Sequence, residues 1–160
     1  MKNKMTEKLF ELAYTDSMTE VRNRNAYEER LKKLRKPNAN ISRITVIVVD
    51  VNGLKEINDS YGHFCGDDAI KTVAKALRDT IGLKADIFRI GGDEFVCISE
   101  SSVLPYISQF KDTIYFINNE KLYNLSVSIG YSRFHEKYSK SIDDIICRAD
   151  EKMYKDKKSK

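Results

Sequence analysis

The sequence of 160 residues predicts an α/β (α+β) fold, in which helices cover a central, mainly antiparallel sheet. Three observations support this class: a run of β-branched residues typical of a buried strand, apolar residues that recur at helical spacing, and two short apolar segments separated by a glycine pair. The length suits one domain, and no apolar stretch approaches the roughly 20 residues that cross a bilayer. We therefore expect a single domain with no membrane segment in this chain.

The first helix and the first strand of the core lie close together in the sequence. Residues 23–34 form the expected helix, with Asn25 and Glu28 at the spacing of a capping box. The run at residues 44–49 is β-branched almost throughout, which is typical of a strand whose two faces are both buried. This strand is expected to end at Asp50.

A β-hairpin is predicted after the next helix. Apolar residues recur at helical spacing up to Ile81, after an acidic start at residues 66–68. Residues 86–90 and 95–99 have the pattern of strands, and glycines separate them, so we expect an antiparallel pair with acidic residues near its tip. The remaining predicted elements are a helix at 103–117, a strand at 125–129 and a final helix at 142–154.

Charge and cysteine content exclude several classes of protein. The net charge is +4, and five lysines lie within the last nine residues, but no signature of a nucleic-acid-binding module accompanies them. We therefore expect no polymeric nucleic acid as a partner. The three cysteines are Cys65, Cys97 and Cys147. Their wide separation supports neither a disulfide framework nor a clustered zinc site, and a reducing cytoplasm fits them best.

Three carboxylates are predicted to meet at one end of the sheet. Asp50 closes the most apolar strand, while Asp93 and Glu94 lie on the hairpin, so adjacent strands would bring them together. Mutual repulsion makes such a cluster unfavourable unless cations bind to it. Magnesium suits it, because this small hard ion binds a few carboxylate oxygens and completes its octahedron with waters and phosphates. A single carboxylate at a strand end usually caps a turn or faces solvent, so the hypothesis depends on all three.

Glycines lie next to these acids in both segments. Gly91 and Gly92 can adopt backbone angles closed to other residues and allow a ligand to approach the main chain. Gly53 opens a turn before the next helix, where the amide groups of residues 52–55 can bind phosphates and Lys55 adds a positive charge. Each glycine alone is more often ordinary turn chemistry, so these positions matter only together with the carboxylates.

The segment at residues 89–95, Arg-Ile-Gly-Gly-Asp-Glu-Phe, resembles the signature that names the GGDEF family of diguanylate cyclases. Further segments resemble other motifs of this family in the expected order: the entry motif at 16–19 and 23–24, the first-strand and substrate motif at 50–59, 61–63 and 66–67, and the closing elements at 128–130, 148–150 and 153–154. The resemblance begins at about Asp16. We therefore expect a connecting helix at residues 1–15 and a GGDEF domain at residues 16–160.

The resemblance implies a palm-like fold related to class III nucleotidyl cyclases and polymerases. It also implies an activity, because a diguanylate cyclase joins two GTP molecules into cyclic di-GMP and releases two pyrophosphates. Two Mg²⁺ ions per active site support this reaction, and Mn²⁺ can substitute for them. By position, the metal ligands are Asp50, the backbone carbonyl of Val51, Asp93 and Glu94. Asp93 also has the catalytic acceptor role.

The same resemblance assigns the contacts with GTP. Lys55 and Lys157 are expected to bind phosphates, while Asn58 and Asp67 recognise the guanine base. The turn that precedes Lys55 completes the site with Asn52, Gly53 and Leu54. An ionised Asp67 only accepts hydrogen bonds, and guanine offers N1–H and its 2-amino group as adjacent donors. The alternative role of Asp67 is to cap the helix that follows.

The sequence departs from the family pattern at several places. Asn52 stands where many members have a second aspartate, and Glu20 and Val21 replace a glycine and a leucine of the entry motif. Residues 82–86 contain no arginine. Because an arginine is needed there to grip phosphate and stack on guanine, we expect no inhibitory site for the product.

The partners implied by the resemblance follow from the product, which contains two nucleotides although one domain carries one GTP site. A transient homodimer is therefore expected to form around GTP. We also expect a sensor domain in a longer parent protein, with this domain in the cytoplasm whether or not the parent is membrane-bound. Two alternatives stay open: a module that binds GTP or cyclic di-GMP without catalysis, and a related cyclase that makes another cyclic dinucleotide.

Overall fold

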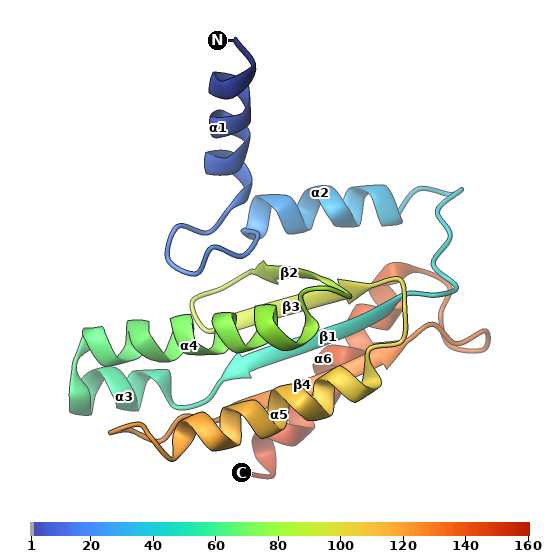
Figure 1. Cartoon of the computed structure of the whole chain (residues 1–160). Helices are drawn as coiled ribbons and strands as arrows, with labels where there is room; N and C mark the ends of the chain where they lie inside the picture. Colours follow the sequence, from blue (N-terminus) through green and yellow to red (C-terminus); the bar gives the residue numbers. More distant parts are fainter. Residues whose placement is uncertain (1) are drawn as a thin grey trace.

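A four-stranded antiparallel sheet lies at the centre of the structure, a computed structural model that describes the backbone of residues 2–160 and the side chains of residues 6–160 (Figure 1). The strands are β1 (Thr45–Val51), β2 (Asp86–Arg89), β3 (Glu94–Ser99) and β4 (Val127–Arg133), in the spatial order β2-β3-β1-β4. Every neighbouring pair in this order is antiparallel. The predicted α+β class, with a hairpin at one side of the sheet, is therefore confirmed.

Helices cover both faces of this sheet (Figure 1). The helices of the structure are α1 (Lys2–Tyr14), which projects away from the sheet, and α2 (Arg24–Leu34), α3 (Leu54–Tyr61), α4 (His63–Ile81), α5 (Leu104–Asn118) and α6 (Ile142–Lys158). The helices α3, α4 and α5 pack on one face, and α2 and α6 pack on the other. In the described part of the chain, no helix combines the length and the apolar character needed to pass through a bilayer.

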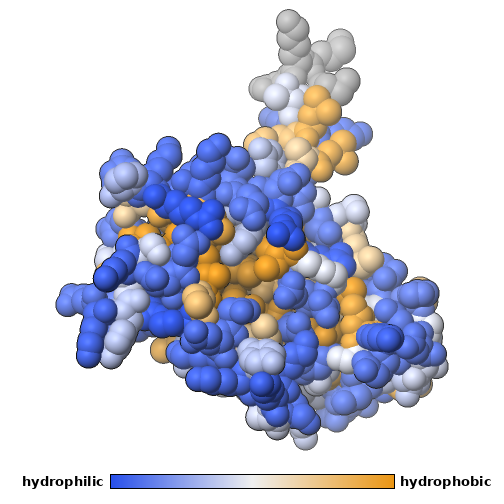
Figure 2. Space-filling view, turned by 180° about the vertical axis from the view of Figure 1, so that it is seen from behind, coloured by the Kyte–Doolittle hydropathy of each residue, from blue (hydrophilic) through white to orange (hydrophobic). Residues whose placement is uncertain are grey.

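The central strand β1 separates two hydrophobic cores. Ile47 and Val49 pack with α4 and α5 in one core, whereas Val46 and Val48 pack with α2 and α6 in the other. Successive side chains of a strand point to opposite faces, and every residue of β1 is buried because both faces are covered. The predicted strand with two buried faces is thus confirmed. Figure 2, seen from the side opposite to Figure 1, shows hydrophobic side chains framed by hydrophilic ones.

Two element boundaries differ from the prediction because of local hydrogen bonds. The Asn23 side chain accepts a hydrogen bond from the Ala26 amide at 3.1 Å, so Asn23 and not Asn25 caps α2. The last strand begins at Val127 and not at Leu125, because its pairing with β1 starts there. The buried side chain of Leu125 belongs to the core without belonging to the strand.

The helices α4 and α6 are both longer than predicted. α4 begins at His63 and not near residue 66, directly after Gly62, whose φ of +84° ends α3 and turns the chain. The two helices consequently lie back to back in the sequence with one glycine between them. α6 continues to Lys158, past the predicted end at Tyr154. Three lysines in its last turn fit this extension, because cations stabilise the negative end of a helix.

The glycine pair of the hairpin has a different structural reason from the one predicted. Among the described residues, positive φ angles of glycine occur at Gly53 and Gly62, so neither Gly91 nor Gly92 uses a left-handed backbone. A Cβ atom added at Gly91 would lie 2.6 Å from the Glu94 carboxylate. Gly91 is therefore explained by the close approach of this side chain, and the predicted backbone angles are wrong.

Glu20 is strained, and its replacement offers a test of the entry turn. Among the described residues other than glycine, a positive φ occurs at Glu20, where it is +60°. This region costs an ordinary side chain about 1–2 kcal/mol. We expect Glu20→Gly to raise the free energy of unfolding by about 0.5–1 kcal/mol, since part of the relief is offset by the flexibility of glycine in the unfolded chain. Urea denaturation measures this change.

Glu20→Ala is the matched control for this prediction. It removes the same side chain, including a 3.7 Å ion pair with Arg78 that is largely solvent-exposed, but it keeps the strained backbone. Alanine should therefore give no gain in stability. Equal stability of the glycine and alanine variants would contradict the strain argument.

Candidate active site

The paired ends of β1 and β3 bring the predicted acidic residues together. The register sets Asp50 opposite Glu94, and the Val51 amide donates a hydrogen bond to the Asp93 carbonyl at 2.9 Å. Residues directly opposite each other in an antiparallel pair have Cβ atoms about 4.5–5.5 Å apart. The backbone therefore brings all three acidic residues to one end of the sheet.

The last turn of α6 reaches the same end of the sheet. Asp50 is 5% exposed, and its Oδ1 accepts a hydrogen bond from Lys157 Nζ at 2.7 Å. This hydrogen bond is the main reason that the pKa of Lys157 lies above its ordinary value, and the charges of Asp93 and Glu94 raise it further. This contact connects α6 with the end of β1, although Lys157 and Asp50 lie far apart in the sequence.

The site carries more negative charge than Lys157 neutralises. Burial raises the pKa of Glu94 above its ordinary value, and the charges of Asp93, Asp50 and Asp150 raise it further, while Lys157 acts in the opposite direction. Like charges at short range disfavour ionisation of each other. We did not predict a contribution from Asp150, because only the packing of α6 on the sheet brings this residue near the hairpin.

The donor atoms at this end of the sheet suit a hard cation, but they are not preformed for one. Carboxylate and carbonyl oxygens are the ligands that Mg²⁺ prefers. Within residues 6–160, however, no three His, Cys, Asp or Glu side chains already converge as a metal site. One reason is that Lys157 Nζ holds an oxygen of Asp50 that a metal ion would need. A bound cation would therefore displace this ammonium group.

The turn between β1 and α3 is built by Gly53. Its φ of +63° lies in the left-handed region, and it directly precedes Leu54, the first residue of α3. The first amides of a helix have no partner within the helix and attract anions. The predicted turn is therefore present, with Lys55 exposed at the start of the helix. Phosphate binding at this turn stays a prediction.

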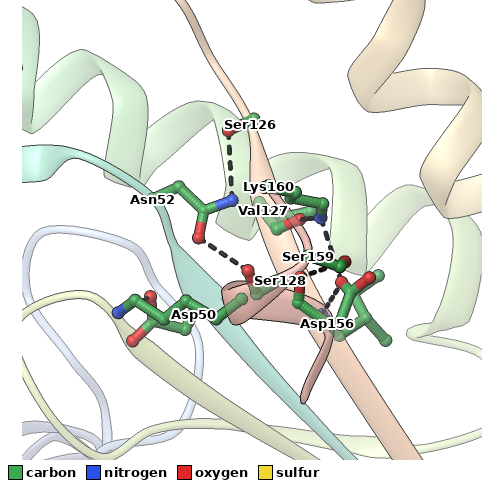
Figure 3. Close-up of polar contacts among 10 residues, drawn as sticks. Asp50, Asn52, Ser126, Val127, Ser128, Asp156, Ser159 and Lys160 are labelled. Carbon is green, nitrogen blue, oxygen red and sulfur yellow. Dashed lines mark hydrogen bonds and ion pairs between the residues drawn. The ribbon is translucent and has the colours of Figure 1, made fainter. Parts of the chain in front are cut away.

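Asn52 points toward β4 and not toward this turn (Figure 3). Its Nδ2 donates to Ser126 Oγ at 3.1 Å, and its Oδ1 accepts from Ser128 Oγ at 2.7 Å. Its backbone amide donates to the Ser126 carbonyl at 2.9 Å. The expectation that this amide helps to cradle phosphates is therefore wrong, because the amide is already used. Asn52 instead fixes the end of β1 to β4, beside the acidic residues.

The two predicted guanine contacts lie on the neighbouring helices α3 and α4. Asp67 is half-buried in the second turn of α4, and α4 has no side-chain N-cap, so the capping role of Asp67 is wrong. The next residue, Asp68, accepts hydrogen bonds from Lys121 Nζ and the Tyr123 hydroxyl at 2.5 Å each. In the described part of the chain, no comparable hydrogen bond engages Asp67.

Gly66 leaves the space in which the Asn58 side chain lies. A Cβ atom at Gly66 on α4 would overlap the amide group of Asn58 on α3, so the two helices can pack this closely only without a side chain at position 66. We expect Gly66→Ala to displace Asn58 and to weaken binding of a guanine nucleotide by about tenfold, which corresponds to the loss of one good hydrogen bond. Isothermal titration with a GTP analogue measures this change.

The control for Gly66→Ala is the same change made in an Asn58→Ala background. If Gly66 acts only through Asn58, its replacement has no further effect there. A second tenfold loss in the double variant would show that the alanine disturbs α4 itself.

A family model described as diguanylate cyclase, GGDEF domain, matches residues 13–160. The chain belongs to the GGDEF family. This confirms the resemblance of the signature and of the motifs around it. The acidic residues of the GGDEF signature are those that the register of β1 and β3 brings beside Asp50.

Curated relatives of this GGDEF domain are named as cyclases. The probable diguanylate cyclase DgcI of Escherichia coli strain K12 is 31% identical over 153 residues, which cover 94% of this chain and 33% of that protein. A diguanylate cyclase of Vibrio cholerae serotype O1 is 31% identical over 170 residues, which cover 97% of this chain and 50% of that protein. The chain thus spans between a third and a half of the length of these relatives.

Solved structures of GGDEF proteins share the fold. The coiled coil and GGDEF domain of DgcB from Caulobacter crescentus, in complex with c-di-GMP, has a TM-score of 0.81 at 22% identity, covering 98% of this chain and 87% of that chain. The diguanylate cyclase SiaD from Pseudomonas aeruginosa, in complex with its activator SiaC, also has a TM-score of 0.81 at 22% identity, covering 99% and 64%. At this identity the similarity establishes the fold.

The GGDEF signature loop is held by an arginine to which we had assigned no role. Arg89 Nη2 donates to the Gly92 carbonyl at 2.8 Å, and Arg89 Nη1 donates to Asp16 Oδ1 at 3.1 Å. Burial alone would raise the pKa of Asp16, but hydrogen bonds from Thr19 and Arg89 outweigh it and keep this pKa below its ordinary value. The entry motif of the GGDEF domain is therefore tied directly to its signature loop.

Ion pairs engage Asp86, in the segment where the sequence predicts no inhibitory site for the product. Asp86 forms ion pairs with Arg22 at 3.4 Å and Arg30 at 3.8 Å. These arginines come from the entry turn and α2, and they face a carboxylate that is only partly buried. The expected absence of an inhibitory site at residues 82–86 stays a prediction.

Proposed function

We propose that this GGDEF domain is a diguanylate cyclase, which condenses two GTP molecules into cyclic di-GMP and releases two pyrophosphates. The observation that carries this proposal is the register that sets Asp50 opposite Glu94 and the Val51 amide on the Asp93 carbonyl. This register explains how acidic residues from separate sequence motifs come together at one end of the sheet. The names of the relatives support the same activity.

Two Mg²⁺ ions, or Mn²⁺ in their place, fit the oxygen donors of Asp50, Asp93, Glu94 and the Val51 carbonyl. When bound, such ions activate an attacking hydroxyl group and neutralise the leaving pyrophosphate. The excess negative charge around Glu94 is the property of this chain that favours them. Asp93 is assigned the role of proton acceptor for the 3′-hydroxyl group of GTP.

Lys157 and Lys55 are assigned to the phosphates of GTP. In the structure Lys157 is bound to Asp50, so a cation at Asp50 and a phosphate near Lys157 would each replace half of this ion pair. The exchange keeps both charges neutralised, which limits its electrostatic cost. The amides of Gly53 and Leu54 at the start of α3 complete the phosphate contacts, while Asn52 positions β4 beside them.

Asn58 and Asp67 are assigned to the guanine base. Asp67 accepts hydrogen bonds from N1–H and the 2-amino group of guanine, whereas adenine offers an unprotonated N1 at this edge. The half-buried position of Asp67 on α4, without a capping role, supports this assignment. The choice of GTP over ATP would therefore depend mainly on one carboxylate.

The decisive experiment is chromatography of the products that the purified protein forms from GTP and Mg²⁺. Cyclic di-GMP is the expected product. Intact GTP together with tight binding of GTP or cyclic di-GMP would favour the non-catalytic module. A mixed dinucleotide formed when GTP and ATP are supplied together would favour a related cyclase.

The proposed reaction requires two copies of the domain, because each copy carries one GTP site. The helix α1 offers a short apolar surface, with Leu9 59% and Leu12 71% exposed, which is too little for a stable coiled coil. Figure 2 shows hydrophobic residues on this projecting helix. We therefore assign α1 to the connection with a sensor domain of a longer, cytoplasmic or membrane-bound protein, and the active species to a transient homodimer in the cytoplasm.

The specific activity is expected to fall when the protein is diluted, since two half-sites must meet. A leucine zipper fused ahead of α1 should raise the rate per domain severalfold at low concentration, because it increases the local concentration of the partner. Cyclase assays over a dilution series, with sedimentation of the same samples, measure both effects. A constant specific activity in protein that is monomeric throughout the series would contradict the two-half-site mechanism.

A further inference from the structure

Four side chains at the C-terminal end of the chain follow the outer edge of β4. Arg148 donates to the Arg133 carbonyl at 2.9 Å, Lys152 donates to the Tyr131 carbonyl at 3.0 Å, Asp156 accepts from the Ile129 amide at 2.9 Å, and Lys160 donates to the Val127 carbonyl. Their spacing is every fourth residue, while the groups they contact lie on every second residue of the strand. We call these four contacts the α6–β4 ladder.

The ladder exists because two repeats nearly match. Four residues of an α-helix rise by about 6.0 Å, and two residues of a strand advance by about 6.6 Å. The helix and the strand run in opposite directions, so each turn of the helix meets the next outward-facing backbone group. Gly130 permits this close packing, because a Cβ atom there would overlap the backbone of Ala149 and Met153.

Asp156 is the rung that defines the position of α6 along the strand. The other three side chains are long cations that donate to carbonyl groups, and their flexible stems can follow a small shift of the helix. Asp156 is short and accepts from an amide. If α6 moved along β4 to the neighbouring backbone group, this carboxylate would face a carbonyl oxygen and the two would repel each other. Lys160 Nζ donates a hydrogen bond to Asp156 Oδ2 at 3.0 Å and thereby holds this carboxylate in place (Figure 3).

Lys157 directly follows this rung and reaches Asp50 from the same turn. This turn is the last of α6, which ends at Lys158. Helix ends fray unless other groups hold them, and a frayed turn would let the Lys157 ammonium group leave the acidic residues. The contacts of Asp156 and Lys160 with β4 hold the backbone from which Lys157 extends.

We propose that Asp156, braced by Lys160, is a positioning residue that fixes α6 on the edge of β4 and thereby places Lys157 beside Asp50 at the nucleotide site. The inference rests on the proposed function, since binding of GTP phosphate by Lys157 is part of it. Among the described residues, the Asp156 side chain forms its hydrogen bonds with Ile129 and Lys160 and not with the acidic residues of the site. Its effect on GTP passes entirely through Lys157.

The first test compares Asp156→Ala with Asp156→Asn, using the α,β-methylene analogue of GTP, which cannot be cyclised. Alanine removes the acceptor for the Ile129 amide, so the affinity should fall about tenfold, equivalent to about 1.4 kcal/mol, and the Ile129 amide should exchange with solvent more than tenfold faster. Asparagine keeps an acceptor and should stay within about threefold of the original protein. Glu151→Ala, an exposed acid on the same helix, is the matched control and should change neither quantity.

The second test is a double-mutant cycle with Lys157→Met. If Asp156 acts through Lys157, Asp156→Ala causes no further loss of analogue binding in the Lys157→Met background, although it still accelerates exchange at Ile129. An equal tenfold loss in both backgrounds overturns the inference, because it shows a general structural effect. Lys160→Ala, at the exposed end of the chain, tests the same link with less disturbance of the fold. Unchanged affinity and unchanged Ile129 exchange in this variant would likewise overturn it.

These readouts separate the inference from the proposed function. Absence of analogue binding by the unaltered protein contradicts the proposed function, whatever the Asp156 variants do to the Ile129 amide. Normal binding that is insensitive to Asp156→Ala, with accelerated exchange at Ile129, contradicts the positioning role alone.

Discussion

Asp93→Ala is expected to lower the cyclase rate by about three orders of magnitude while the domain stays folded. The variant removes both an oxygen donor for the metal ions and the proposed proton acceptor, and losing such a group from a transition state costs several kcal/mol, where each 1.36 kcal/mol is about a tenfold change in rate. Its backbone carbonyl still accepts the hydrogen bond from the Val51 amide. Product chromatography under saturating GTP measures the rate.

The stability of Asp93→Ala should match or slightly exceed that of the original protein. Asp93 is one of the like charges that raise the pKa of Glu94, so its removal relieves repulsion in the metal-free protein. Asp112→Ala, an acid-to-alanine change exposed on α5, is the control and should leave both rate and stability unchanged. Cyclase activity near normal in Asp93→Ala would refute the assigned site, whereas a lost activity with lost stability would leave only a folding defect.

The parts of the fold that follow from local sequence pattern could be predicted. The β-branched run of β1 and its continuous burial agree, because a strand covered on both faces is typically a nearly continuous run of apolar residues. The hairpin of β2 and β3 also agrees, since two short strands around a glycine pair have few other ways to meet. These two elements are enough to predict that Asp50 and Glu94 approach each other.

The parts that depend on contacts between distant segments could not be predicted from local pattern. Nothing in the sequence around Asn52 indicates that its backbone amide donates to the Ser126 carbonyl. The family pattern suggested instead that Asn52 belongs to the substrate-binding turn. The pairing of Lys157 with Asp50 was not predicted, because the family resemblance assigned Lys157 to phosphates and Asp50 to metal ions. The α6–β4 ladder was missed, although a signal exists in hindsight: charged residues at every fourth position of a C-terminal helix, facing an edge strand whose outward groups need partners.

The same limit applies to the glycines. Gly53 was correctly predicted as a turn residue, and its positive φ confirms this. Gly91 and Gly130 have instead been explained by what lies next to them, the Glu94 side chain in one case and the backbone of α6 in the other. A glycine that makes room for a distant segment has no local sequence signal, because its neighbours in the chain are not its neighbours in space.

Gly130→Ala is expected to destabilise the domain by about 3 kcal/mol, near the upper end of the cost of overpacking a core. The added Cβ atom would overlap the backbone of Ala149 and Met153, and backbone atoms cannot rotate away as a side chain does. The helix α6 must therefore move away from β4, which breaks the ladder and withdraws Lys157 from Asp50, so the affinity for GTP falls together with stability. Gly92→Ala is the matched control for stability, because a Cβ atom there meets nothing within 4 Å and its φ is not positive. Urea denaturation of the two variants should differ by most of this cost, and equal stabilities would show that α6 does not depend on the absence of a side chain at position 130.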